Sequence, residues 1–175
     1  MNVSVALLRG INVGGHRKVP MAALRDLLAD AGYERVETYI QSGNVVFSHP
    51  SSSPAALQAD LEAVLADALG FEVPVVLRTR AELAEVVARN PYPGVEHTKL
   101  HVLFFSDELP AGELERIDVR KFAPETLVAR AREIYLHLPD GMGRAKLPSA
   151  LGRLALPATA RNWRTVEKLL DLMSY

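Results

Sequence analysis

The residues best suited to chemistry in this chain are the bases and glycines of residues 7–20, which read LLRGINVGGHRKVP. Arg9, Arg17 and Lys18 carry positive charge, and glycines let backbone N–H groups approach a ligand closely. Pro20 opens a helical pattern whose first N–H groups are further donors to an anion. The stretch therefore predicts an anion-binding loop. The alternative is a crossover that serves chain geometry alone.

Two established phosphate-binding motifs come close to this loop without matching it. Gly10 and Gly15 have the spacing of the P-loop, G-x-x-x-x-G-K-[S/T]. His16 and Arg17 stand where that motif needs Lys and Ser/Thr, so the magnesium-binding hydroxyl is missing. The dinucleotide motif G-x-G-x-x-G fails at Asn12, which replaces its middle glycine. Neither motif is assigned.

A second loop, PDGMGRAKLP at residues 139–148, also combines glycines and bases with a proline that opens a predicted helix. The string G-x-x-K-[VL]-P-x-A occurs at residues 15–22 and again at residues 143–150. A third polar group follows at Arg161-Asn162-Trp163, where Asn162 is placed to cap a terminal helix. Trp163 is expected to anchor a core, with stacking on a base or sugar as the alternative.

Catalytic signatures are absent from the sequence. The 5 histidines have no metal-ligand spacing, the chain has no cysteine, and no G-x-S-x-G elbow occurs. His101, in a predicted strand, is a candidate general base, and Ser42, in a predicted turn, is a candidate nucleophile without a base partner. A structural role is the favoured interpretation of His101, and turn chemistry explains Ser42 adequately. No metal or cofactor is predicted, and whether the chain is an enzyme stays open.

The first half of the chain reads as β-α-β-β-α-β. Valine-rich runs predict strands, Pro20 and Ser53-Pro54 begin helices that stop at Gly32 and Gly70, and Gly43-Asn44 is expected at the centre of a tight hairpin turn. The elements predicted are strands in residues 3–8, 35–48 (a hairpin) and 73–78, and helices in 20–31 and 54–69. This order is ferredoxin-like.

The second half repeats part of this pattern. Thr79 and Glu82 form a capping box for a connecting helix, and residues 90–98, NPYPGVEHT, read as a linker. Beyond it come a strand (KLHVLFFS), a short helix (AGELERIDV), a hairpin turning near 130–133, a helix after Pro148 and a terminal helix. We therefore predict an α+β fold of two ferredoxin-like subdomains, each a small antiparallel sheet packed on helices. The expected domains are residues 1–78, a connector at 79–98, and residues 99–175.

The net charge of -1 conceals an uneven distribution. Residues 1–20 have three bases and no acid, residues 21–119 have 16 acids against 7 bases, and residues 120–175 have 10 bases against 5 acids. If the basic ends meet, they form one positive patch. The first apolar run is too short to span a membrane and lacks the features of a signal peptide, so a cytoplasmic protein is expected.

Several segments resemble a bacterial family catalogued as domain of unknown function 1697. They are LLRGINVGGHRKVPM, TYIQSGNVVF, KLHVLFF, REIYLHLPDGMGRAKL and ATARNWRTVEKL. The resemblance implies a cytosolic α/β protein of two related subdomains, and no established activity. Arg17 and Ala131 depart from the family pattern, where a small polar residue and a glycine are usual. The candidate ligand-binding residues, from the motifs and this resemblance together, are Arg9, Gly10, Asn12, Gly14, Gly15, Lys18, Gln41, Ser42, Asn44, Lys99, Arg144, Lys146, Arg161, Asn162 and Trp163.

The leading hypothesis is that these segments converge on one pocket for a phosphate-bearing ligand, either a nucleotide or a nucleic-acid end. Two alternatives stay open. One is an enzyme acting on a phosphorylated or nucleic-acid substrate. The other is a protein-interaction module or homodimer that pairs through a sheet edge or the terminal helix. No membrane partner is expected.

Overall fold

A computed structural model describes residues 1–174 of the chain. It divides into two compact units. Unit 1 consists of residues 1–84 together with the C-terminal segment from Lys168, and unit 2 of residues 85–167. Within the described residues, no helix is long and apolar enough to cross a membrane.

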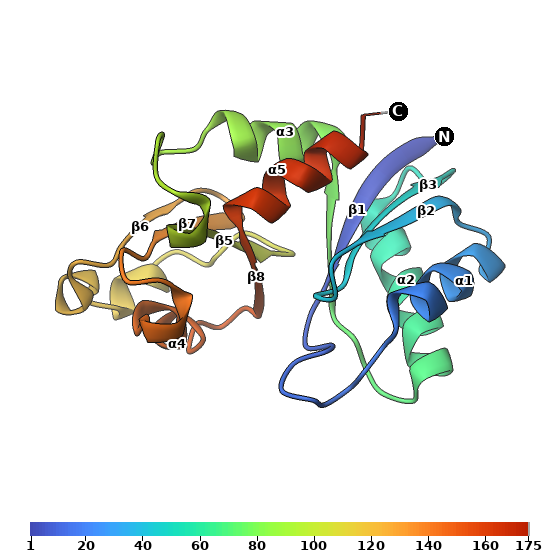
Figure 1. The fold of residues 1–175 in the computed structure, drawn as a ribbon, viewed down its shortest axis with the longest axis horizontal. Helices are drawn as coiled ribbons and strands as arrows, with labels where there is room; N and C mark the ends of the chain where they lie inside the picture. Colours follow the sequence, from blue (N-terminus) through green and yellow to red (C-terminus); the bar gives the residue numbers. More distant parts are fainter. Residues whose placement is uncertain (175) are drawn as a thin grey trace. The chain divides into compact units, whose positions relative to one another are not determined.

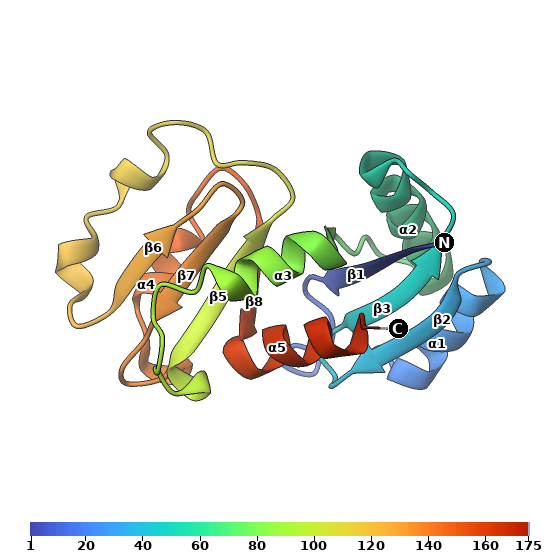
Figure 2. The same ribbon diagram turned by 90° about the horizontal axis from the view of Figure 1, so that it is seen from above.

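Unit 1 contains a four-stranded antiparallel sheet with two helices against one face (Figures 1 and 2). Its elements, in chain order, are β1 (Asn2–Leu8), α1 (Met21–Asp30), β2 (Glu34–Tyr39), β3 (Asn44–His49), α2 (Pro54–Leu69) and β4 (Val75–Thr79). The strand order is β2-β3-β1-β4, with β1 antiparallel to both β3 and β4. The predicted ferredoxin-like β-α-β-β-α-β order is confirmed.

The core of unit 1 lies between this sheet and the two helices. Because side chains alternate along a strand, Ala6 and Leu8 of β1 share one face with Val45 and Phe47 of β3. Leucines of the two helices at helical spacing pack onto that face: Leu24 and Leu28 from α1, and Leu57, Leu61 and Leu65 from α2. The apolar residues at strand spacing and those at helical spacing therefore form one hydrophobic core.

The ends of the helices follow the sequence signals closely. Ser53 caps α2 by accepting a hydrogen bond from the Ala56 N–H, and Gly70 ends it in the left-handed conformation. The capping box also forms: the Thr79 N–H donates to Glu82, and the Glu82 N–H donates to the Thr79 hydroxyl. The helix that it starts, α3, runs from Arg80 to Ala88.

The turn between β2 and β3 differs from the prediction. It consists of residues 40–43, and Asn44 is already the first residue of β3, with a fully buried side chain. Only Gly43, at φ +82, supplies the expected positive φ from the Gly43-Asn44 pair, while Ile40 has φ +50. Pro20 is also displaced by one position, because it is the N-cap of α1 rather than its first helical residue.

Unit 2 has a second sheet with the same order of strands, β6-β7-β5-β8. Its strands are β5 (Leu100–Phe105), β6 (Thr126–Ala129), β7 (Glu133–His137) and β8 (Ala158–Asn162), and its helices include α4 (Leu147–Leu151) and the start of α5 (Trp163–Leu172). The strand order is that of unit 1 with β5 in the place of β1, so the predicted duplication of the fold is confirmed.

One face of the second sheet carries the core of unit 2. Leu103, Ile134 and Leu136 project from the strands against Leu147 and Leu151 of α4. Two short 3₁₀ turns, Leu114–Arg116 and Val119–Phe122, stand where unit 1 has its first helix, and they pack Leu114 and Phe122 onto the same core. The short helix expected at residues 111–119 is therefore only a 3₁₀ turn.

Strand β8 was not predicted as a strand. Its sequence, ATARN, alternates small and polar residues and has no apolar run, so periodicity alone does not reveal it. The duplication demands a strand at this position, because β4 precedes a capped helix in unit 1 just as β8 precedes α5 in unit 2. Asn162 caps α5 by accepting from the Thr165 N–H at 2.9 Å, as predicted.

Candidate anion-binding loop

The glycine-rich stretch of unit 1 folds into a small hairpin between β1 and α1. The Asn12 N–H donates to the Arg17 carbonyl at 3.1 Å, and the His16 N–H donates to the Val13 carbonyl at 3.0 Å. Gly14 and Gly15 form the turn at its tip with φ of +58 and +77, a conformation that glycine adopts without strain. Residues 13–18 are all exposed. The loop is thus a short projecting ribbon, not an irregular crossover.

Asn12 fixes this hairpin to the rest of unit 1. Its amide group donates to the Val19 carbonyl at 3.0 Å and to the Gln41 carbonyl at 2.7 Å, while its side-chain oxygen accepts from the Val19 N–H at 2.8 Å. The backbone of Leu8 also bonds to Gly43. The structure therefore brings together two segments that the sequence singled out, the glycine-rich loop and the turn containing Gln41 and Ser42.

The turn is held from within by Asn44. Its amide donates to the Tyr39 carbonyl at 3.0 Å and contacts the Ser42 hydroxyl at 2.8 Å. A Cβ on Gly43 would lie 2.8 Å from Ile11 Cδ1 and 2.9 Å from Leu8 Cβ, so only glycine fits where the turn meets the loop. Asn12 and Asn44 thus hold the glycine-rich loop and the β2–β3 turn in their conformations through hydrogen bonds. Gln41 is exposed on the surface of the turn.

Donors suited to an anion surround the base and tip of the hairpin. Within residues 1–174, the N–H groups of Gly10, Gly14 and Gly15 have no protein acceptor. Helix α1 begins with Pro20 at its N-cap, without a side-chain cap and without an acidic residue in its first turn. Its first N–H groups therefore present partial positive charge to solvent.

Two of the three bases of the loop are available for a ligand. Arg9 and Lys18 are exposed, and neither forms an ion pair or side-chain hydrogen bond within the described part of the chain. Arg17, in contrast, lies over the ring of Phe71 at 5.0 Å and donates to the Glu72 carbonyl at 3.4 Å. Its φ of +50 is part of this conformation. We conclude that Arg17 mainly holds the hairpin against the segment before β4.

The second glycine-rich loop, in unit 2, has a different electrostatic arrangement. There the carboxylate of Glu125 accepts from the Lys146 N–H at 3.0 Å and from the Leu147 N–H at 3.2 Å, at the start of α4. An internal anion thus occupies the donors that would otherwise face a ligand. The side chains of Arg144 and Lys146 are exposed.

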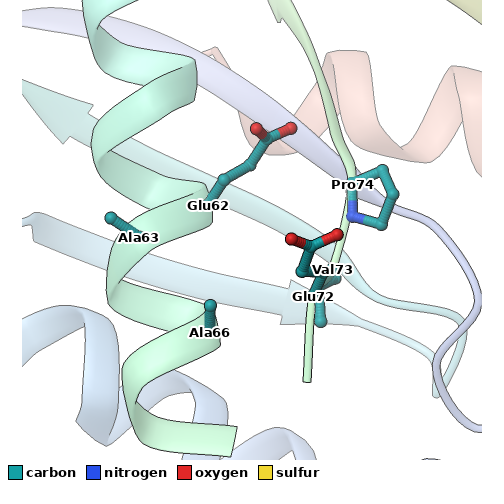
Figure 3. A pocket seen from close by; sticks show the side chains of 6 residues that line it. All are labelled: Glu62, Ala63, Ala66, Glu72, Val73 and Pro74. Carbon is teal, nitrogen blue, oxygen red and sulfur yellow. The ribbon is translucent and has the colours of Figure 1, made fainter. Parts of the chain in front are cut away.

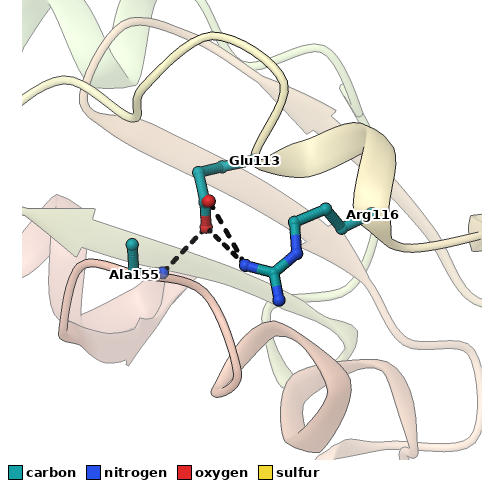
Figure 4. Close-up of polar contacts among 3 residues, drawn as sticks. All are labelled: Glu113, Arg116 and Ala155. Atoms are coloured by element: carbon teal, nitrogen blue, oxygen red, sulfur yellow. Dashed lines mark hydrogen bonds and ion pairs between the residues drawn. The ribbon is translucent and has the colours of Figure 1, made fainter.

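A second glutamate of unit 2 also accepts a hydrogen bond from a backbone N–H group, in the loop that contains Ala155. Glu113 accepts from the Ala155 N–H at 2.9 Å and from Arg116 at 3.3 Å (Figure 4). The hydrogen bond from Ala155 is the main cause that lowers the pKa of Glu113 below its usual value, with Arg116 contributing less. Neither Glu113 nor Glu125 stands out in the sequence, because a lone glutamate in a polar segment resembles any solvated charge.

The remaining candidates of unit 2 are largely structural. Arg161 is buried and donates to the Thr159 hydroxyl at 2.7 Å and the Ala160 carbonyl at 2.8 Å, and burial lowers its pKa to about 10. Trp163 is buried with its ring 6.4 Å from that of Tyr135, as expected of a core anchor. Lys99 is partly exposed and directly precedes β5.

The two residues considered for catalysis lie in structural settings, one in the β2–β3 turn and one in β5. Ser42 contacts Asn44, and His101 is buried with its Nδ1 unpartnered, so burial lowers its pKa. His49 is also buried, in β3, where its Nε2 lies 2.8 Å from the Ser4 hydroxyl. Burial of both partners, at 4% exposure each, keeps a substrate from this pair.

Unit 1 also has an acidic surface pocket of about 380 Å³ (Figure 3). Glu62 of α2 and Glu72 line it with Ala63, Ala66, Val73 and Pro74. None of the predicted site residues lines this pocket. Across residues 1–174, no group of three or more His, Asp, Glu or Cys side chains is placed to hold a metal ion.

Comparison with known proteins places the chain in a family. No curated protein sequence matches it. A solved structure, that of the conserved bacterial protein SP0830 from Streptococcus pneumoniae, is similar over 99% of both chains with 25% identity and a TM-score of 0.77. The profile of the family described as protein of unknown function DUF1697 matches residues 1–135, which include the glycine-rich loop and all of unit 1 up to α3. The chain belongs to the DUF1697 family, as its sequence motifs indicated.

Proposed function

We propose that the hairpin of residues 9–18 in unit 1 binds a phosphate group, carried by a nucleotide or by the end of a nucleic acid. The observation that carries this proposal is the open N-terminus of α1 behind a loop that has three bases and no acid. A helix N-terminus stabilises an anion because its first N–H groups are unpaired.

Each part of the loop has a distinct role in this proposal. Lys18 and Arg9 supply charge, and the N–H groups of Gly14 and Gly15 supply hydrogen bonds without steric obstruction. Asn12 orders the loop in advance of binding through its bonds to Val19 and Gln41. A loop that is ordered before binding loses less conformational entropy when the ligand arrives.

The second loop enters this proposal as a comparison. Its helix N-terminus faces Glu125, so a phosphate there would meet an existing negative charge and donors that are already bonded. Arg144 and Lys146 remain candidates by virtue of their exposed charge alone. A substitution at Arg144 therefore distinguishes one loop from the other.

A thermal-melt titration with phosphate, sulfate and adenosine monophosphate tests the proposal. At a hundred times its dissociation constant, a ligand adds about 2.7 kcal/mol to the unfolding free energy. For a chain of this length we expect a rise in Tm of about 5–10 °C. Lys18→Ala should abolish most of the rise, whereas Lys121→Ala, which removes an exposed charge from unit 2, should preserve it.

The outcome at Arg144 decides how far the site extends. Loss of the rise in Lys18→Ala but not in Arg144→Ala supports a site in the first loop alone. Loss in both variants supports the wider site expected from the sequence. An unchanged Tm with all three anions at millimolar concentration contradicts the proposal.

A further inference from the structure

We infer that the ligand of this hairpin is a nucleic-acid polymer, held by two or more phosphates of its backbone, rather than a free nucleotide. This inference rests on the proposed function and narrows it. The observations that carry it are the projecting form of the hairpin and an exposed apolar pair beside its basic residues.

Exposed aliphatic side chains concentrate at this place in the molecule. Val13 is 64% exposed and Ile40 is 49% exposed, and among the described residues only Met1 is a third large exposed apolar side chain. The two segments are neighbours, because Asn12 bonds to Gln41. Exposed apolar groups beside charges are typical of interaction surfaces. Here they would contact the sugar and base edges that lie between phosphates.

The donors of the hairpin are distributed from its tip to its base, so together they can contact more than one phosphate group. Gly14 and Gly15 form its tip, Lys18 follows its base, and Arg9 lies three residues before the base, directly after β1. With a rise of about 3.3 Å per residue, the tip lies about 7–10 Å from the base. A polymer offers phosphates at both positions, whereas a mononucleotide offers one.

The shape of the loop also fits an extended partner. All residues from 13 to 18 are exposed, so the hairpin is a convex projection, whereas small-molecule sites are concave. The major groove of a DNA duplex, about 12 Å wide, accommodates a two-stranded ribbon. Backbone N–H groups, lysines and helix N-termini are the groups that contact phosphates in such complexes.

Fluorescence anisotropy with the full chain tests this inference. The probes are a labelled DNA duplex of about 20 base pairs and a matching single strand, with adenosine monophosphate and inorganic phosphate as competitors. We expect either polymer to bind at least about tenfold more tightly than adenosine monophosphate, with a logarithmic salt slope near -2 for two phosphate contacts on a duplex. Lys18→Ala should make that slope less steep by about 1.

The apolar pair provides the decisive variant. Val13→Ser combined with Ile40→Ser should weaken polymer binding by about threefold to tenfold, because burial of these side chains is lost. The same variant should leave phosphate and adenosine monophosphate binding unchanged. Val13→Ile with wild-type Ile40 retains the apolar area and the branched shape, so it serves as the matched control. Its circular dichroism and Tm confirm folding.

Three results would overturn the inference. If adenosine monophosphate binds as tightly as the polymers, the site takes one phosphate, and the proposed function survives without the inference. If polyglutamate competes as well as DNA at equal charge, the partner is an acidic protein segment. If neither polymers nor phosphates bind, both the inference and the proposed function fail.

Discussion

The two glycine-rich loops of this protein share the string G-x-x-K-[VL]-P-x-A but not its structure. In the first loop Pro20 is the N-cap of α1, so Lys18 lies two residues before the cap. In the second, Lys146 is itself the N-cap and Pro148 lies inside the first turn of α4. The same sequence motif therefore begins its helix at different positions in the two loops. As a result, the two lysines occupy different positions relative to the helix N-terminus.

The loops differ equally in what faces their helix. No side chain caps α1, whereas Glu125 bonds to two N–H groups at the start of α4. The first loop is instead held by the hydrogen bonds between Asn12 and Val19, and residues 13–18 stay exposed. A basic glycine loop is therefore a candidate anion site only where no internal carboxylate already occupies it.

Removing the hydrogen bonds of Asn12 should have the largest effect. Asn12→Ala deletes three hydrogen bonds and places alanine at φ +54, so we expect the unfolding free energy to fall by about 2–4 kcal/mol. Urea unfolding measures this loss. Asn12→Asp keeps the bond from the Val19 N–H and should lose less. Equal losses in both variants would mean that the bond accepted from the Val19 N–H contributes nothing.

The contact between the loop and the turn should respond next. Gly43→Ala introduces a Cβ within 2.9 Å of Leu8 and 2.8 Å of Ile11 at φ +82, and we expect a loss of about 2–3 kcal/mol. Gly15→Ala has a similar φ of +77 but meets no atom within 4 Å, so it should lose only about 1 kcal/mol. Similar losses at the two positions would show that packing of the turn on the loop is unimportant.

Removal of the Glu125 carboxylate should make the second loop resemble the first, because the N-terminus of α4 then has no internal acceptor. Glu125→Ala leaves the N–H groups of Lys146 and Leu147 without their acceptor and should lower the unfolding free energy by about 1–2 kcal/mol. Sulfate should then recover part of the lost Tm, because the vacated donors can bind it. If sulfate has the same effect on the wild type and the variant, occupation by Glu125 is not what separates the loops.

The smallest expected effect is on pH dependence, and it compares one histidine in each unit. Burial lowers the pKa of His49 and of His101, so the folded state binds fewer protons than the unfolded state near pH 6. The contribution of the two histidines to the unfolding free energy should therefore be fully present above the unfolded pKa of about 6.5. It should be lost as the pH falls below that value.

Urea unfolding at neutral and mildly acidic pH checks this dependence. The double variant His49→Gln with His101→Leu should show a smaller decrease than the wild type between these two conditions. His49→Gln leaves an amide that can bond to Ser4, so its own effect on the neutral form should be small. A decrease of the same size in the double variant would assign the acid sensitivity to other groups.

Much of the fold could be predicted from the sequence because its signals are local. Valine-rich strands, Ser53 and Gly70 at the ends of α2, and the Thr79–Glu82 capping box each act within a few residues. Strand β8 could not be recognised in this way, since Arg161 and Thr159 are buried by tertiary contacts that its composition does not reveal. Only the repeat of strand order explains it.

The candidate site was predictable in part, for the same reason. Glycines and bases identify the first loop, but the partners of Asn12 and of Glu125 lie 29 and 21 residues away in the chain. Those distant bonds decide which donors are open. Arg17 illustrates the limit, because the sequence shows only its positive charge, whereas its position over Phe71 holds the hairpin in place.

Calorimetric titration of inorganic phosphate into Pro20→Asp tests the central claim most directly. Aspartate at the N-cap would place a carboxylate at the start of α1, as Glu125 does for α4. We expect this variant to gain about 0.5–1 kcal/mol of unfolding free energy from the new cap, and to lose phosphate binding that the wild type shows. Phosphate binding of unchanged affinity in Pro20→Asp would contradict the account.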